Sequence, residues 1–303
     1  MDSSPVTRRD ALKGAGLALV TFSFAEVTTA CSTSTPGKGR GAGGGSDTEN
    51  DTLAQIKKQG YASLAIANEP PYTKVNPDGT VTGAAPDIAH AALKGMGVPK
   101  VQGVVTPYDT MIPGLKAGRW DIITAGLFMK QSRCEQIAYS EPQVVSTESF
   151  AVPPGNPKNL HNVADLKKNS KVKVAALPGA FEFGVLQGKG IPDSQIVKVK
   201  DGRSGIEAVA AGRADAFMLP TLSLKALKTK KTKFEVTPPI QDVPPTGAGA
   251  GFRKSDTKFR DAYNKSLHKF KQTDEYAKLL RKWGFSAEAV KGVTTEQLCK
   301  NPG

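Results

Sequence analysis

The sequence has few of the residues that support metal or thiol chemistry. Its 303 residues include three cysteines and three histidines, too few for a disulfide-dense scaffold or an array of zinc sites. The histidines, His90, His161 and His268, show no metal-ligand spacing, so we expect neither a metal nor a cofactor. After residue 30 no apolar run reaches the roughly 18 residues of a membrane-spanning helix. This excludes a channel or permease as the function.

Acidic residues are also scarce relative to basic ones, and the net charge is +13 at pH 7. Few aromatic residues interleave with the densest basic cluster, at 225–233. Surfaces that bind nucleic acid by base stacking need both residue types. The pattern therefore favours a solvated basic surface over a nucleic-acid-binding one.

The first fifty residues predict export and tethering. Residues 1–30 resemble a twin-arginine export signal that begins at Arg8 and Arg9, and such signals are removed from the mature protein. The approach to Cys31 resembles a bacterial lipobox, in which that cysteine is acylated; cleavage that leaves it unmodified is the alternative. The Gly- and Ser-rich segment 31–52 predicts a flexible tether. We expect a lipoprotein on the outer face of the cell membrane, or a periplasmic protein.

After residue 53, short apolar runs alternate with amphipathic helical patterns, which predicts an α/β fold. The length is enough for about two compact units. The fragment Ala-Gly-Arg-x-Asp occurs at 117–121 and again at 211–215, each time between a helical pattern and an apolar run. We interpret this repeat as two lobes of similar architecture, with mainly parallel sheets flanked by helices. Strands are expected at 61–67, 121–125, 172–177, 196–199 and 214–219.

Two extended segments, 144–152 and 246–252, are placed to carry the chain between the lobes. They predict that residues 53–148 and 249–303 form lobe 1, and that residues 149–248 form lobe 2. A pair of crossing strands makes a hinge, and the cleft beside it is the expected ligand site.

Several motifs recur in a fixed order along the chain, at 68–72, 83–88, 113–121, 133–135, 139–142 and 276–284. Their order and spacing resemble the family-3 extracytoplasmic solute-binding proteins of ABC importers. Within that family the chain is most similar to the subgroup that binds ectoine and 5-hydroxyectoine. The resemblance implies a periplasmic-binding-protein fold without enzymatic activity, working as a monomer. It implies a small zwitterionic compatible solute as ligand and ABC permease subunits as partners.

Ectoine carries an amidinium, a carboxylate and an apolar ring edge, and lobe 1 offers groups for each. By the resemblance, Arg133 holds the carboxylate through paired N–H donors. Glu69 follows a strand at the edge where open α/β sheets bind ligands, and it is the expected partner of the amidinium. Tyr72, Tyr108 and Phe128 are candidates for an aromatic box around the cation.

Lobe 2 offers less. Phe181 opens a helix after a strand, and it either closes the aromatic box or anchors the core. Thr221 is a candidate neutral hydrogen-bond donor. Amino-acid binders of this family usually have an aspartate near the end of the strand after Gly-Arg-x-Asp, but no acid follows Asp215 there. This favours a cyclic zwitterion over an ordinary α-amino acid.

The other two cysteines, Cys134 and Cys299, are expected to form a disulfide, since thiols oxidise outside the cytoplasm. Two alternative functions stay open. The first is the same role with a polar or basic amino acid, or a betaine, as ligand. The second is a dehydratase-type enzyme on this fold, with Glu69 as the general acid.

Overall fold

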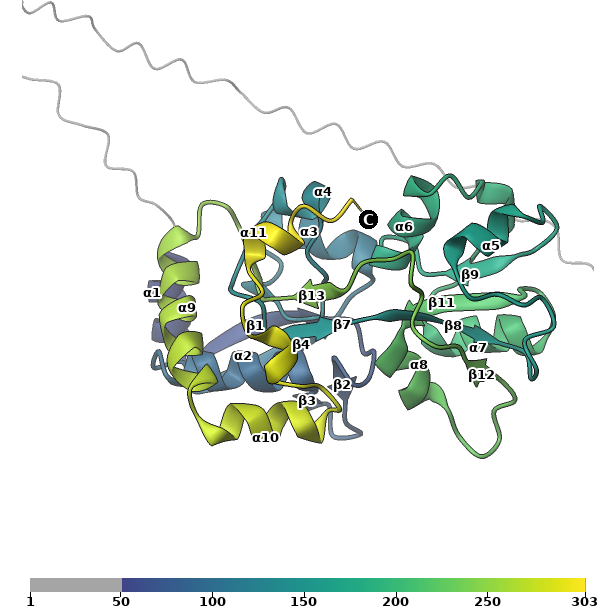
Figure 1. The fold of residues 1–303 in the computed structure, drawn as a ribbon. Coiled ribbons are helices and arrows are strands. Elements are labelled where there is room, and N and C mark those ends of the chain that lie inside the picture. The colour runs from purple at the N-terminus through teal and green to yellow at the C-terminus, as the bar shows by residue number, and fades with distance from the viewer. Residues whose placement is uncertain (1–50, 303) are drawn as a thin grey trace, which may run out of the picture. The chain divides into compact units, whose positions relative to one another are not determined.

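The computed structural model describes residues 51–302. The predicted export signal, the tether and the lipid site at Cys31 lie outside these residues. Within the described part, no helix is both long and apolar enough to cross a bilayer. The described chain forms two lobes, each built on a five-stranded sheet (Figure 1).

The first lobe contains a sheet in the order β4-β1-β5-β14-β6. Strand β1 is parallel to both of its neighbours, whereas β14 is antiparallel to β5 and β6. The strands are β1 (Tyr61–Ile66), β4 (Lys100–Val105), β5 (Ile122–Ile123), β6 (Ala138–Tyr139) and β14 (Gly251–Phe252). Helix α2 packs against α9 and α10. The helices are α1 (Thr52–Gln59), α2 (Ala84–Lys94), α3 (Tyr108–Lys116), α4 (Gln131–Cys134), α9 (Thr257–Lys271), α10 (Asp274–Lys282) and α11 (Thr295–Leu298).

The second lobe repeats this plan with the order β10-β9-β11-β8-β12. Strand β9 is parallel to β10 and β11, and β8 is antiparallel to β11 and β12. The strands are β8 (Glu148–Val152), β9 (Val174–Ala176), β10 (Ile196–Lys198), β11 (Ala216–Pro220) and β12 (Glu235–Val236). The helices are α5 (Val163–Lys167), α6 (Phe181–Gly188), α7 (Gly202–Ala210) and α8 (Thr221–Leu227).

The chain crosses between the lobes twice. It leaves the first lobe through β7 (Val144–Ser146) and returns through β13 (Thr246–Ala248). These two strands pair antiparallel, with Thr246 opposite Ser146, and β7 runs on toward β8 between the two lobes (Figure 1). The predicted boundaries at residues 148 and 249 stay a prediction.

The predicted two-lobed α/β fold is confirmed, but the sheets are mixed rather than mainly parallel. The antiparallel members, β8 and β14, directly follow the crossing strands β7 and β13. They enter their sheets from the opposite lobe and so run against the neighbouring strands. Sequence reasoning also missed the exposed edge strand β4 and the hairpin of β2 (Lys74–Val75) and β3 (Val81–Thr82).

The repeated Gly-Arg-x-Asp fragment has the same structural role in both lobes. The glycine of each copy has a positive φ, 70° and 67°, the left-handed conformation with which glycine follows a helix end. The aspartate of each copy then accepts a backbone N–H across the sheet. Asp121 Oδ2 lies 2.8 Å from the Ser63 nitrogen, and Asp215 Oδ2 lies 2.8 Å from the Lys173 nitrogen. The motif thus ends a helix and anchors the next strand.

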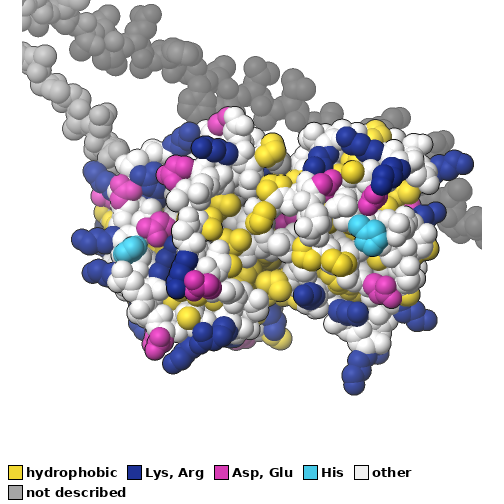
Figure 2. Space-filling model, in the orientation of Figure 1, with side chains coloured by type: hydrophobic (Ala, Val, Ile, Leu, Met, Phe, Trp, Pro, Cys, Tyr) yellow, Lys and Arg dark blue, Asp and Glu magenta, His cyan; other side chains and the backbone are white. Residues whose placement is uncertain are grey.

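The positive charge is dispersed. On the face drawn in Figure 2, Lys and Arg side chains are spread over both lobes, with Asp and Glu side chains among them.

Candidate functional site between the lobes

A narrow cavity lies between the lobes, with a free volume of about 10 Å³. Both lobes line it, and most of its lining is aromatic or charged. From the first lobe the lining residues are Glu69, Tyr72, Tyr108, Gly126, Phe128 and Arg133. From the second lobe they are Ala180, Phe181, Glu182 and Pro220. A cavity this small requires the lobes to part before a solute can enter.

The aromatic rings stand edge to face around the cavity. Phe128 is central, with centroids 5.6 Å from Tyr72 and 5.8 Å from Phe181. All three side chains are buried. Gly126 makes room for this packing, because a Cβ there would lie 2.5 Å from a Tyr72 ring carbon. The structure thus brings the predicted aromatic residues together, with Phe181 contributed by the second lobe.

Glu69 lies just after β1 and is almost fully buried. Two hydroxyls donate to its carboxylate: Ser223 Oγ to Oε1 at 2.6 Å and Tyr108 OH to Oε2 at 3.4 Å. Burial, followed by the repulsion of nearby Glu182, raises the pKa of Glu69 to about 7. The carboxyl is therefore poised between its two charge states near neutral pH, where a ligand cation would favour the ionised form.

Arg133, on α4, is buried and lines the same cavity. Its Nη1 donates to the Phe128 carbonyl and its Nη2 to the Gly179 carbonyl, both at 2.7 Å. The first bond orients the guanidinium and the second joins it to the other lobe. Because a guanidinium has five N–H donors, Arg133 keeps donors for a ligand carboxylate.

Two buried carboxyls that sequence reasoning missed lie on the second-lobe side. Glu182 is the second residue of α6 and lines the cavity, while Glu148 opens β8 behind it. Burial raises the pKa of both groups, and each group shifts the pKa of the other. Arg133 and Lys130 favour the ionised form of Glu182, so Glu148 is the more readily protonated of the two. No sequence signal distinguished Glu182 from an ordinary acid in a helix's first turn.

Thr221, which was expected to donate a hydrogen bond to the ligand, does not line the cavity. Its hydroxyl is engaged with Thr147 Oγ1 at 2.9 Å and Ser149 Oγ at 2.8 Å, which ties α8 to the hinge side of β8. The neutral donor from this helix is Ser223, two residues later, which reaches across to Glu69. The sequence favoured Thr221 because its hydroxyl is the first one after the strand. The helical turn instead directs the hydroxyl of Ser223 toward Glu69.

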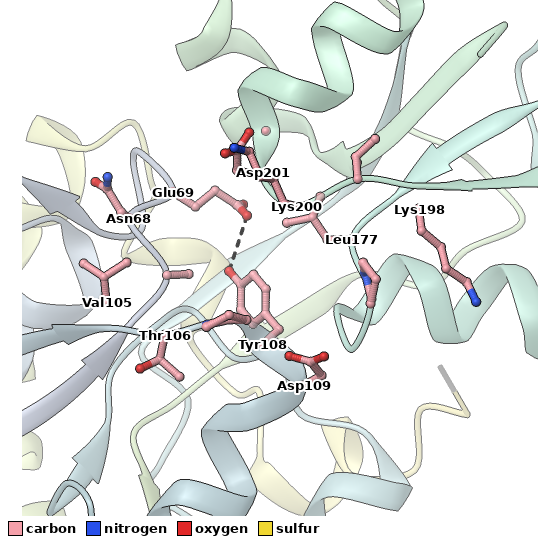
Figure 3. A pocket seen from close by; sticks show the side chains of 15 residues that line it. Asn68, Glu69, Val105, Thr106, Tyr108, Asp109, Leu177, Lys198, Lys200 and Asp201 are labelled. Atoms are coloured by element: carbon pink, nitrogen blue, oxygen red, sulfur yellow. Dashed lines mark hydrogen bonds between the residues drawn. The ribbon is translucent and has the colours of Figure 1, made fainter. Parts of the chain in front are cut away.

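A wider vestibule of about 570 Å³ adjoins the cavity and is also lined by both lobes. Glu69 and Tyr108 line both spaces, so their hydrogen-bonded pair forms part of the wall between them (Figure 3). Leu177, Lys200 and Asp201 face them from the second lobe. The vestibule offers a route by which a solute reaches Glu69.

The short helix α4, which carries Arg133, is cross-linked to the C-terminal tail through the next residue, Cys134. A disulfide joins Cys134 to Cys299, with 5.8 Å between the Cα atoms. The C-terminal tail also accepts the Gln131 N–H through the Asn301 carbonyl at 3.0 Å. These contacts fix α4, and with it Arg133, against the end of the chain. Among residues 51–302 no group of His, Cys, Asp and Glu side chains is arranged to hold a metal ion.

Comparison with known proteins identifies the family. Residues 63–287 match the bacterial extracellular solute-binding proteins, family 3. This chain belongs to that family. A probable amino-acid ABC transporter periplasmic-binding protein of Sinorhizobium fredii is 34% identical over 261 residues, 82% of this chain and 86% of the relative. The histidine-binding periplasmic protein of Salmonella typhimurium is 27% identical, covering 73% of this chain and 86% of that protein.

Solved structures of solute-binding proteins share the fold. The crystal structure of EhuB in complex with hydroxyectoine has a TM-score of 0.80 and 43% identity, covering 83% of this chain and 98% of that one. An ancestral amino-acid-binding protein, described as a precursor of cyclohexadienyl dehydratase, has a TM-score of 0.67 and 26% identity, over 77% and 99% of the two chains. The resemblance inferred from the motifs is confirmed. The protein is the extracytoplasmic solute-binding component of an ABC importer, and its homologues are binding proteins rather than enzymes.

Proposed function

We propose that this solute-binding protein takes up ectoine or 5-hydroxyectoine between its lobes and delivers it to the permease of an ABC importer. In this role it serves the uptake of a compatible solute. The predicted acylation of Cys31 belongs to the same proposal, because a lipid anchor and a flexible tether would hold the lobes near the permease.

The observation that carries the proposal is the pairing of opposite charges in one aromatic cavity. The Glu69 carboxylate and the Arg133 guanidinium line the same enclosed space, and aromatic rings form walls between them. A cyclic zwitterion presents its amidinium to Glu69, its carboxylate to Arg133 and its ring to Phe128. The hydroxyectoine complex of EhuB, at 43% identity, supports this choice of ligand.

Binding is coupled to closure because the site has two halves. Ser223 contacts Glu69 and Arg133 contacts the Gly179 carbonyl, and both bonds span the lobes. Only the closed arrangement brings residues of both lobes to the ligand, so the ligand shifts the population toward it. The permease then distinguishes the closed, loaded form from the open one.

An α-amino acid is the second candidate, and Glu182 is the observation that favours it. A second buried carboxylate in the cavity could accept an α-ammonium or the side chain of a basic amino acid. The curated relatives are described as binders of amino acids such as histidine. Against this candidate, β11 ends at Pro220 and α8 begins with Thr221, so that strand's own end supplies no carboxylate. The acid opposite Pro220 is Glu148 of β8, which does not line the cavity.

Calorimetric titration of the full chain with ectoine, 5-hydroxyectoine, glycine betaine, arginine and glutamine tests the proposal. We expect micromolar or tighter binding of ectoine or its hydroxylated form, and a large loss of affinity in the Arg133→Ala and Phe128→Ala variants. Binding of an amino acid without binding of either ectoine would replace the ligand and retain the importer role.

A further inference from the structure

The cavity holds more acid than a simple zwitterion requires. Glu69 comes from the first lobe and Glu182 from the second, both line the cavity, and they are 8% and 3% exposed. Arg133 is the one basic residue among the cavity-lining residues. Once a ligand carboxylate pairs with Arg133, two carboxylates on opposite lobes remain for the cationic part of the ligand.

The surroundings of Glu182 suit it to accept hydrogen bonds from a ligand. Glu148 stands behind it at the start of β8, and the Thr246 hydroxyl donates to Glu148 Oε1 at 3.2 Å. Thr246 belongs to the returning strand β13, so this hydrogen bond lies at the crossing between the lobes. Glu182 lines the cavity, and Arg133 and Lys130 favour its ionised form, so it is placed to offer a carboxylate there. Two like charges at close range repel each other unless a cation lies between them.

We propose that Glu69 and Glu182 form a two-lobed clamp for a planar, delocalised cation, with one carboxylate on each side of it. A cyclic amidinium has N–H groups on two sides of its ring carbon, and each would donate to the carboxylate of a different lobe. This inference rests on the proposed function and concerns its specificity. The ligand cation bridges the two lobes, whereas Arg133 binds the ligand carboxylate. Closing the lobes around the cation replaces a repulsion by two charge-assisted hydrogen bonds.

The test separates the cation from the carboxylate by using two probes on the full chain. One probe is ectoine, and the other is its decarboxylated analogue, a cyclic amidine without a carboxylate. We expect Glu182→Gln to weaken the binding of both probes by roughly 10- to 100-fold, the range of one hydrogen bond to a charged group. Arg133→Lys should weaken ectoine binding by a larger factor than amidine binding, because the lost contact to the Gly179 carbonyl affects closure around both probes, whereas the lost paired donors to a carboxylate affect ectoine alone.

The matched control is Glu235→Gln, since Glu235 is an exposed glutamate on the edge strand of the same lobe. Glu148→Gln removes the neighbouring carboxyl but leaves Glu182 in place. It should therefore lower the affinity for the amidine less than Glu182→Gln does. If Glu182→Gln fails to fold, Glu182→Asp keeps the charge but places it one methylene farther from the ligand. This variant should then lower the affinity for the amidine more than Glu235→Asp does.

Three outcomes decide the matter. Weaker binding of both probes by Glu182→Gln, with an Arg133→Lys loss that is larger for ectoine than for the amidine, supports the clamp. Amidine binding by Glu182→Gln equal to that of Glu235→Gln overturns the clamp while the proposed function stands. A wild-type protein that binds neither ectoine, 5-hydroxyectoine nor the amidine overturns both.

Discussion

Replacing Glu69 by glutamine should have opposite effects on stability and on binding. Glu69 is buried and its pKa is raised from 4.5 to about 7, chiefly by burial and then by Glu182. Glutamine has the same shape, and its amide oxygen can accept from Ser223. Its amide nitrogen can donate to the Tyr108 hydroxyl, whose own hydrogen can turn to the Ala125 carbonyl at 3.3 Å. It has no charge at any pH, so the substitution isolates the charge of Glu69 from its packing.

The sign of the stability effect follows from proton linkage. A carboxyl whose folded pKa is above its unfolded pKa makes the folded state bind more protons between those two values. The ligand-free wild-type protein therefore loses stability as the pH rises from about 4.5 to about 7, and the loss is complete above this window. The rise of this pKa from 4.5 to about 7 corresponds to about 3 kcal/mol of stability. The Glu69→Gln variant lacks this loss and should be more stable by up to about 3 kcal/mol at pH 8, but equal at pH 4.5.

Binding should respond in the opposite direction. An amidinium pairs with the ionised carboxylate, so wild-type affinity for ectoine should fall roughly tenfold between pH 8 and pH 6 as Glu69 takes up its proton. The variant has no charge to offer and should lose most of its affinity at every pH. A group that destabilises the empty protein yet binds the ligand is a common compromise at functional sites.

Urea unfolding of the ligand-free proteins at pH 4.5 and pH 8, together with calorimetric titration at pH 6 and pH 8, measures both effects. Glu235→Gln is the control, because that glutamate is exposed and should alter neither quantity. The reasoning is refuted if Glu69→Gln is less stable than the wild type at pH 8. It is refuted equally if wild-type affinity for ectoine is the same at pH 6 and pH 8.

Three more predictions follow from contacts within and between the lobes. Gly179 has a positive φ, and a Cβ there would lie 2.5 Å from the backbone of α3 in the first lobe. Gly179→Ala should therefore hinder closure and bind ectoine roughly tenfold more weakly than the control variant Gly212→Ala. Gly212 has a similar φ, but a Cβ there would meet open space. Phe128→Leu should weaken ectoine binding by about 2- to 30-fold through the loss of a cation–π contact, and calorimetry showing full affinity would exclude that contact. Replacing both Cys134 and Cys299 by serine should lower the unfolding free energy by about 2–4 kcal/mol and make stability insensitive to reductant; an unchanged urea midpoint would contradict this.

Much of the fold could be predicted from local sequence. Alternating apolar runs and amphipathic patterns indicated the strands and helices to within a few residues; β1, for example, was expected at 61–67 and lies at Tyr61–Ile66. The glycine of each Gly-Arg-x-Asp fragment indicated where the preceding helix ends, because glycine adopts the positive φ found there without steric cost. Short and exposed elements were missed. β4 is an edge strand whose side chains are largely solvent-facing, and its three valines do not alternate with polar residues.

The candidate site was predictable where a residue type and a motif coincided. Glu69, Tyr72 and Arg133 were proposed from the motifs that contain them. Tyr108, Phe128 and Phe181 were proposed from their places beside expected strand ends, and the structure gathers all six in one cavity. Glu182 was missed because its neighbours in sequence give no hint of what faces it. The choice between Thr221 and Ser223 depended on a helical turn, which sets the direction of each hydroxyl.

Secondary structure and the two-lobed plan thus follow from patterns within a few residues, since hydrogen bonding and burial along one element depend on near neighbours. The meeting of Glu69 with Ser223 and of Arg133 with the Gly179 carbonyl depends on closure of the lobes, whereas Glu148 and Glu182 meet within the second lobe. Desolvation of these carboxyls and the repulsion between them arise only when residues far apart in the sequence share a buried space. The charge state of the site is therefore a property of the folded, closed molecule.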